Sequence, residues 1–126
     1  MFEISVRSRF CAAHHLRGYP GKCAAQHGHN WEVEVFLRGK RLNRAGMLVD
    51  FCDLKESVAG VLDRVDHQDL NRVSLMKGLN PTSENIARVL YKALSSAINR
   101  KDYRVVRVCV RETPETMAGY SEGKGA

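Results

Sequence analysis

Two runs of alternating apolar and polar residues, 2–14 and 27–37, constrain the fold of this 126-residue chain more than any other feature. Alternation with a period of two is typical of a β-strand that buries one face. A short segment that contains Gly and Pro, 17–26, separates the runs. Two such strands joined by a short loop predict an antiparallel pair, in which residues of one parity share a face.

Helical periodicity follows the second run. Apolar residues between 54 and 65 recur every three or four positions, and Asp50 precedes them as a suitable N-cap. A second apolar stripe covers 86–98, and the hydroxyl of Thr82 or Ser83 is suited to cap it. Both segments therefore predict amphipathic helices.

Strand alternation returns at 103–112, where Val106 falls on the same face as Val108, and one further short strand fits near 117–120. The chain shows no internal repeat and no interdomain linker. We therefore predict a single α+β domain over residues 1–126. Its elements should follow the order ββααββ, with an antiparallel sheet and two helices on one face.

Twenty Lys and Arg residues against 14 Asp and Glu residues give a formal net charge of +6 at pH 7. Such an excess can attract nucleic acid, an anionic membrane surface or a phosphorylated small molecule. No run approaches the roughly 18 apolar residues of a membrane-spanning helix, and the first residues lack the pattern of a signal peptide. We expect a cytoplasmic protein whose four widely spaced cysteines form no disulfide framework.

The segment His27-Gly28-His29 is the sharpest chemical feature. On a strand, residues two apart project from the same face with origins roughly 6–7 Å apart, so both imidazoles can reach one metal ion. His14 ends the first strand and can add a third imidazole if the strands pair. Three histidines with one open position are typical of a catalytic zinc site. The alternative is a set of histidines that are merely hydrogen-bonded.

Three further features carry candidate chemistry. Cys23 lies four residues before His27 and could be a fourth ligand, a nucleophile or base, or an ordinary small residue. Asp66 and His67 are adjacent and could transfer protons together, although such a pair also commonly ends a helix. Glu112 ends an apolar strand face, so its carboxylate needs a partner: a ligand's N–H groups or a nearby arginine.

Six segments, in this order, resemble the 6-pyruvoyl-tetrahydropterin synthase family. They are FCAAHHL (10–16), GKCAAQHGHNWEVEV (21–35), GMLVDFCDLK (46–55), DHQDLN (66–71), NPTSENIARVL (80–90) and VRET (110–113). Within the family, the Cys-x3-His-Gly-His spacing that starts at Cys23 resembles the bacterial carboxy-forming branch, because the animal pyruvoyl-forming enzymes typically carry a longer insert there.

The resemblance implies a tunnelling (T) fold whose sheet closes into a barrel in a trimer, with two trimers usually stacked as a hexamer and active sites between subunits. It also implies one zinc ion per subunit. The matching residues are the zinc ligands His14, His27 and His29, the proton acceptor Cys23, the relay pair Asp66 and His67, the catalytic and pterin-anchoring Glu112, and the pterin-binding Thr82 and Ser83.

The implied reaction is a zinc-dependent lyase step of queuosine (7-deazaguanine) biosynthesis. It converts 7,8-dihydroneopterin triphosphate to 6-carboxy-5,6,7,8-tetrahydropterin and releases acetaldehyde and triphosphate. The alternative within the family is formation of 6-pyruvoyl-tetrahydropterin for biopterin synthesis. An alternative of another class is a basic, zinc-stabilised nucleic-acid-binding module, which predicts unfolding without zinc and salt-sensitive binding. The chain lacks the paired-cysteine framework and helix-turn-helix signal of such modules.

Overall fold

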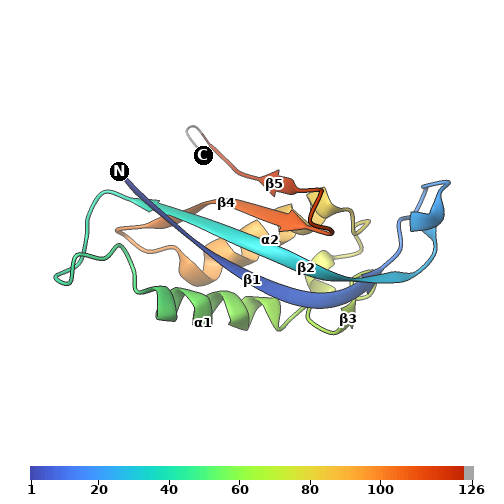
Figure 1. Ribbon diagram of the computed structural model, residues 1–126, viewed down its shortest axis with the longest axis horizontal. Coiled ribbons are helices and arrows are strands. Elements are labelled where there is room, and N and C mark those ends of the chain that lie inside the picture. Colours follow the sequence, from blue (N-terminus) through green and yellow to red (C-terminus); the bar gives the residue numbers. More distant parts are fainter. Residues whose placement is uncertain (124–126) are drawn as a thin grey trace.

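The computed structural model describes residues 1–123, with the side chain of Cys23 excepted, and shows a twisted sheet with two helices on one face (Figure 1). Strands β1 (Phe2–His14), β2 (His27–Gly39), β3 (Gln68–Asp69), β4 (Arg104–Arg111) and β5 (Ala118–Tyr120) lie in the order β3-β1-β2-β4-β5. Helices α1 (Phe51–Leu62) and α2 (Ser83–Ile98) lie between β2 and β4 in the chain. Short 3-10 turns, η1 (Lys22–Ala24) and η2 (Ser74–Met76), complete the elements.

The predicted ββααββ order is confirmed, with one addition. β3 lies between the helices in the chain and pairs with β1 in parallel, whereas the other named pairs are antiparallel. The sheet is therefore mixed. No helix within residues 1–123 is long and apolar enough to cross a membrane.

β1 and β2 form the longest pairing of the sheet. All thirteen residues of each strand are paired, from Phe2 opposite Gly39 to His14 opposite His27. The predicted parity is confirmed, because the even-numbered residues of β1 from Val6 onward, except Ser8, are buried together with the odd-numbered residues of β2 from Trp31 onward. The helices cover this face, which we call the helix face. Side chains of the other parity form the open face.

Both predicted N-caps are confirmed. The Asp50 carboxylate accepts a hydrogen bond from the Cys52 N–H at 2.7 Å, and α1 begins directly afterwards. The Thr82 hydroxyl accepts from the Asn85 N–H at 3.1 Å, so Ser83 becomes the first residue of α2. Capping satisfies backbone donors that have no partner inside the helix.

A β-bulge in β4 contradicts the predicted facing of one valine. Phe36 pairs with Arg107 and Leu37 pairs with Val105, which leaves Val106 as the extra residue. Val105 is fully buried on the helix face, whereas Val106, predicted to share that face with Val108, is only half-buried. The alternation predicted for β4 is therefore correct after the bulge and wrong before it.

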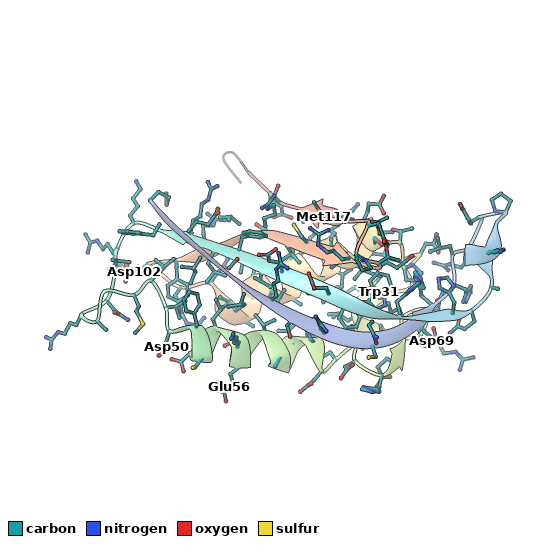
Figure 2. The ribbon with its side chains drawn as sticks, viewed as in Figure 1. Trp31, Asp50, Glu56, Asp69, Asp102 and Met117 are labelled. Carbon is teal, nitrogen blue, oxygen red and sulfur yellow. The ribbon has the colours of Figure 1, made fainter. Side chains whose placement is uncertain are left out.

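The open face carries charged residues in place of a second apolar layer. Arg7 lies 3.5 Å from Glu32 and 3.4 Å from Glu34, and Arg38 lies 2.7 Å from Glu3. In Figure 2 the labels of Trp31 and Asp69 mark one end of the molecule, and those of Asp50 and Asp102 mark the other. The candidate functional residues lie at the Trp31 end.

Candidate metal centre

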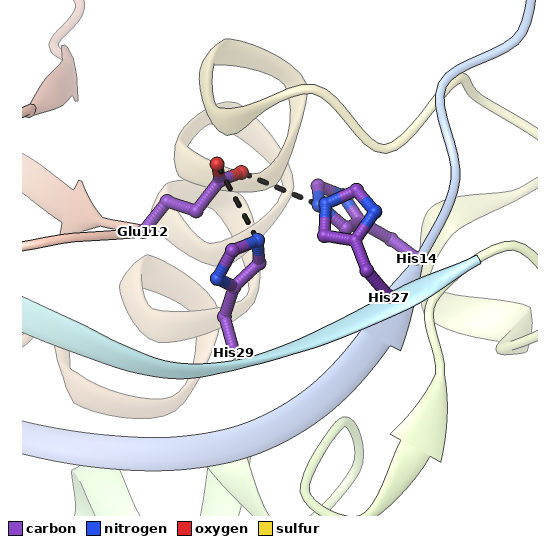
Figure 3. Close-up of side chains that lie close together, drawn as sticks. All are labelled: His14, His27, His29 and Glu112. Carbon is purple, nitrogen blue, oxygen red and sulfur yellow. Dashed lines mark ion pairs between the residues drawn. The ribbon is translucent and has the colours of Figure 1, made fainter. Parts of the chain in front are cut away.

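Three histidines and one glutamate converge on the helix face at the end of β1 and β2 (Figure 3). His14 is the last residue of β1 and pairs with His27, the first residue of β2, while His29 lies two residues further on the same face. Glu112 follows β4 and points at the histidines. One nitrogen or oxygen of each side chain lies within 4.8 Å of those of the other three.

Backbone carbonyls fix the orientation of two of these rings. The Nδ1 of His14 lies 2.8 Å from the Pro81 carbonyl oxygen, and that of His27 lies 2.7 Å from the Ala25 carbonyl oxygen. A carbonyl can only accept, so in both rings Nδ1 carries the proton and donates it. With Nδ1 as the donor, a neutral ring has a free lone pair on Nε2, which is the state that a metal ligand requires.

Burial favours the uncharged form of two of the rings, His14 and His29. Desolvation lowers the pKa of His14 and of His29 below the ordinary value of 6.5. The hydrogen bond to Pro81 opposes this effect in His14, and the Coulombic attraction of Glu112 opposes it in both rings, but desolvation is the largest cause for each. His14 is only 1% exposed.

Two buried nitrogen atoms at the centre lack a hydrogen bond. The Nε2 atoms of His14 and His29 are buried and have no hydrogen-bond partner, although they lie 3.3 Å and 3.4 Å from the Glu112 carboxylate. An unprotonated Nε2 beside a carboxylate brings two acceptors together, which is unfavourable in a buried site. A cation between them would satisfy both, and imidazole nitrogen with carboxylate oxygen is a donor set that zinc accepts. The residues therefore fit a metal ion.

The neighbouring sequence candidates are placed as follows. His15 is directed away from the centre, because its Nδ1 lies 2.9 Å from the Gln26 side-chain oxygen. Thr82 lies beside the centre, since the preceding Pro81 contacts His14. Glu112 has the two histidines as its ion-pair contacts, where the sequence predicted a ligand's N–H groups or an arginine.

Asp66 and His67 are not part of this centre. They lie beside the open face, where the Asp66 carboxylate accepts from the Cys11 N–H at 2.8 Å and lies 3.0 Å from the His67 Nδ1. The hydrogen bond from the Cys11 N–H is the main reason that the pKa of Asp66 is lowered. The His67 backbone is left-handed (φ 58°), a conformation that non-glycine residues rarely adopt. The sheet separates this pair from the histidines.

Cys23 lies within η1 of the loop between β1 and β2, and its side chain lies outside the described part of the structure. Its predicted chemistry therefore stays a prediction.

Sequence reasoning missed Pro81, Ala25 and Cys11. Pro81 and Ala25 act through backbone carbonyls, which side-chain patterns do not reveal. Cys11 could have been recognised, because the alternation of β1 predicts that its side chain lies on the open face.

The mixed sheet backed by two helices, with three converging imidazoles at one end, defines a T-fold protein with a candidate metal centre. The family model described as 6-pyruvoyl tetrahydropterin synthase matches residues 3–123. This chain belongs to the 6-pyruvoyl tetrahydropterin synthase family.

Three relatives illustrate the similarity. The chain is 38% identical over 115 residues to a putative 6-carboxy-5,6,7,8-tetrahydropterin synthase of Archaeoglobus fulgidus, with 91% of each chain covered. It is 33% identical to the 6-carboxy-5,6,7,8-tetrahydropterin synthase of Bacillus subtilis, with 98% of this chain and 88% of that one covered. The structure of Caenorhabditis elegans 6-pyruvoyl tetrahydropterin synthase matches with a TM-score of 0.86 at 31% identity, covering 97% of this chain and 96% of that one.

Proposed function

We propose that this protein is a zinc-dependent lyase that converts 7,8-dihydroneopterin triphosphate to 6-carboxy-5,6,7,8-tetrahydropterin, acetaldehyde and triphosphate in queuosine biosynthesis. One water is consumed to balance the oxygen atoms. The observation that carries the proposal is the pair of buried Nε2 atoms, on His14 and His29, that face the Glu112 carboxylate without a hydrogen bond. The names of the Archaeoglobus and Bacillus relatives favour the carboxy product.

His14, His27 and His29 would hold one zinc ion per chain. The ion would act as a Lewis acid toward the substrate's side-chain hydroxyls. The carbonyl contacts of His14 and His27 keep their Nε2 atoms aimed at the centre. Glu112 is about a quarter exposed, so its carboxylate can also accept hydrogen bonds from the pterin's N–H groups.

Cys23 and the pair Asp66–His67 would move protons. Cys23 as a thiolate removes the proton from the substrate carbon, and the adjacent Lys22 favours that ionised form. His67, oriented by Asp66, exchanges the hydroxyl proton. Thr82 and Ser83, at the N-terminus of α2, bind the pterin ring next to the histidines. The net charge of +6 attracts the triphosphate.

Within one chain, the histidine centre lies on the helix face and the pair Asp66–His67 lies beside the open face. This separation supports an active site that is shared between chains. An open sheet whose edges are β3 and β5 can join its edges to those of other copies and close into a barrel. We therefore propose a homo-oligomer, a trimer or a dimer of trimers. In this assembly Asp66 and His67 of one chain act at the histidine centre of another.

The second candidate is synthesis of 6-pyruvoyl-tetrahydropterin, which the similarity to the Caenorhabditis elegans enzyme favours. Mass spectrometry of the products from zinc-loaded protein and 7,8-dihydroneopterin triphosphate separates the candidates. We expect the carboxy product with acetaldehyde and triphosphate. A pyruvoyl product would assign the second candidate, and no reaction with zinc bound and the oligomer intact would refute both.

The proposed role of Cys23 as the catalytic base is tested in the same assay with the variant Cys23→Ala. We expect about 100-fold to 10,000-fold slower turnover, the range typical of general acid–base catalysis, with zinc content unchanged. Cys52→Ala, which removes an exposed thiol at the start of α1, is the matched control and should keep full turnover. Full turnover in Cys23→Ala would remove this cysteine from the mechanism.

A further inference from the structure

A hollow lies on the open face, on the other side of the sheet from the histidine centre. Its floor is made by Ala13 and Gly28, which pair across β1 and β2. A Cβ placed on Gly28 would find one atom within 4 Å, so this part of the face is empty. Cys11, Asn30 and His67 are among the residues around the hollow, whose volume is about 530 Å³.

Three potential metal donors converge beside this hollow. The Cys11 sulfur, one Asp66 carboxylate oxygen and one His67 ring nitrogen all lie within 4.8 Å of one another. They come from two segments that are far apart in the sequence, and β3 brings these segments together by pairing with β1. The cluster is separate from the four residues on the helix face.

The backbone holds these donors in place before any ion binds. The Cys11 N–H donates to the Asp66 carboxylate at 2.8 Å, and the Cys11 carbonyl accepts from the His67 N–H. The left-handed backbone of His67 turns the chain so that its ring returns to Asp66, where Nδ1 lies 3.0 Å from the carboxylate. A site that is organised in advance loses less entropy on binding.

We propose that Cys11, Asp66 and His67 form a second metal site that suits borderline divalent cations such as Zn²⁺. Thiolate, imidazole and carboxylate together are a zinc donor set, and the fourth position would remain for water. The Cys11 sulfur donates to the Asn30 carboxamide oxygen at 2.9 Å. When a metal ion displaces the thiol proton, which passes to solvent, a rotated Asn30 carboxamide can donate N–H to the thiolate.

The site should be weaker than the histidine centre. In the single chain the His67 side chain is 79% exposed and Cys11 is exposed as well, so these donors are less well shielded from water than the buried histidines. It therefore fills only when zinc exceeds one equivalent per chain. A metal ion bound there occupies the imidazole that transfers protons, so excess zinc would inhibit the enzyme. This last consequence rests on the proposed function, whereas metal binding does not.

The test is a titration of metal-free protein with Co²⁺, which follows zinc chemistry and gives an intense near-ultraviolet band when a thiolate ligates it. We expect two equivalents per chain, with a thiolate band that grows with the second equivalent. That band should persist in Cys23→Ala and in Cys52→Ala and disappear in Cys11→Ser, which still binds the first equivalent. Retention of the first equivalent shows that the Cys11→Ser variant is folded.

Three results would overturn the proposal. These are binding of a single equivalent by the wild type, a second equivalent without a thiolate band, and an unchanged second band in Cys11→Ser. Zinc inhibition is measured separately on the pterin reaction and should be lost in Cys11→Ser. If the pterin reaction itself is absent, the proposed function fails while the titration still decides the second site.

Discussion

The two faces of the sheet carry similar donor atoms in opposite surroundings. On the helix face, His14 is buried and its ring is fixed by a backbone carbonyl, so it is neutral and aimed at one point. On the open face, Cys11 and His67 are exposed and lie beside the Asp66 carboxylate. The same pair of strands supplies both clusters, because successive residues of a strand point to opposite sides.

This difference in burial suits the helix-face cluster to metal binding and the open-face pair to proton transfer. A buried, neutral imidazole is a good permanent ligand, since protonation is disfavoured and no water competes. An exposed imidazole that a carboxylate orients, like that of His67, is accessible to a substrate for proton transfer. Three predictions test the contrast, beginning with the largest expected effect.

Removal of one ligand on the helix face should strongly weaken metal binding at the histidine centre. In His27→Ala we expect zinc affinity to fall by more than about 100-fold, because changes to mere supporting residues already cost 10- to 100-fold. Zinc content is measured on the purified protein by elemental analysis. Asn30→Ala, three residues along β2 on the open face, should retain one zinc per chain. Equal loss of zinc in both variants would contradict the division of roles between the faces.

Packing on the helix face should dominate stability. Leu37 is fully buried, so Leu37→Ala should lower the free energy of unfolding by about 2–5 kcal/mol. Arg7 on the open face is an exposed ion-pair partner of Glu32 and Glu34, and Arg7→Ala should cost less than about 1 kcal/mol. Urea unfolding at one fixed protein concentration measures both. A larger loss in Arg7→Ala would mean that the charged face is held by contacts outside this chain.

The smallest expected effect is on the pH dependence of stability, and it comes from Cys109, a buried thiol on the open face. Cys109 has open-face parity but is only 6% exposed, and burial raises its pKa above the ordinary value of 9.0. Above pH 9 the unfolded chain therefore loses this proton while the folded chain keeps it. The unfolded state then binds fewer protons, so stability falls as the pH rises. Cys109→Ala should flatten this slope between pH 8 and 10, whereas Cys52→Ala should leave it unchanged.

Strand parity made the histidine cluster predictable. His14, His27 and His29 are placed by the alternation of two strands and by one pairing, and each of these can be read from local sequence. The N-caps at Asp50 and Thr82 are equally local, because the capping side chain bonds to an amide two or three residues away.

The remaining features depend on contacts that local patterns do not encode. The bulge at Val106 leaves the valine pattern of β4 intact, so the sequence gives no sign of the extra residue. The contacts of Glu112 with His14 and His29 require knowing that β4 lies beside β2. The hollow at Cys11 requires the parallel pairing of β3, a strand of only two residues.

The unbroken pairing of β1 with β2 has a consequence for folding accuracy. A slip of one residue would turn every β1 side chain to the other face, and His14 would then point away from His27. A metal ion that needs both histidines can bind the correct alignment alone. At a free concentration of 1,000 times its dissociation constant it would add about 4 kcal/mol to that alignment. The ion would thus stabilise the correct register of β1 and β2 in addition to its role in catalysis.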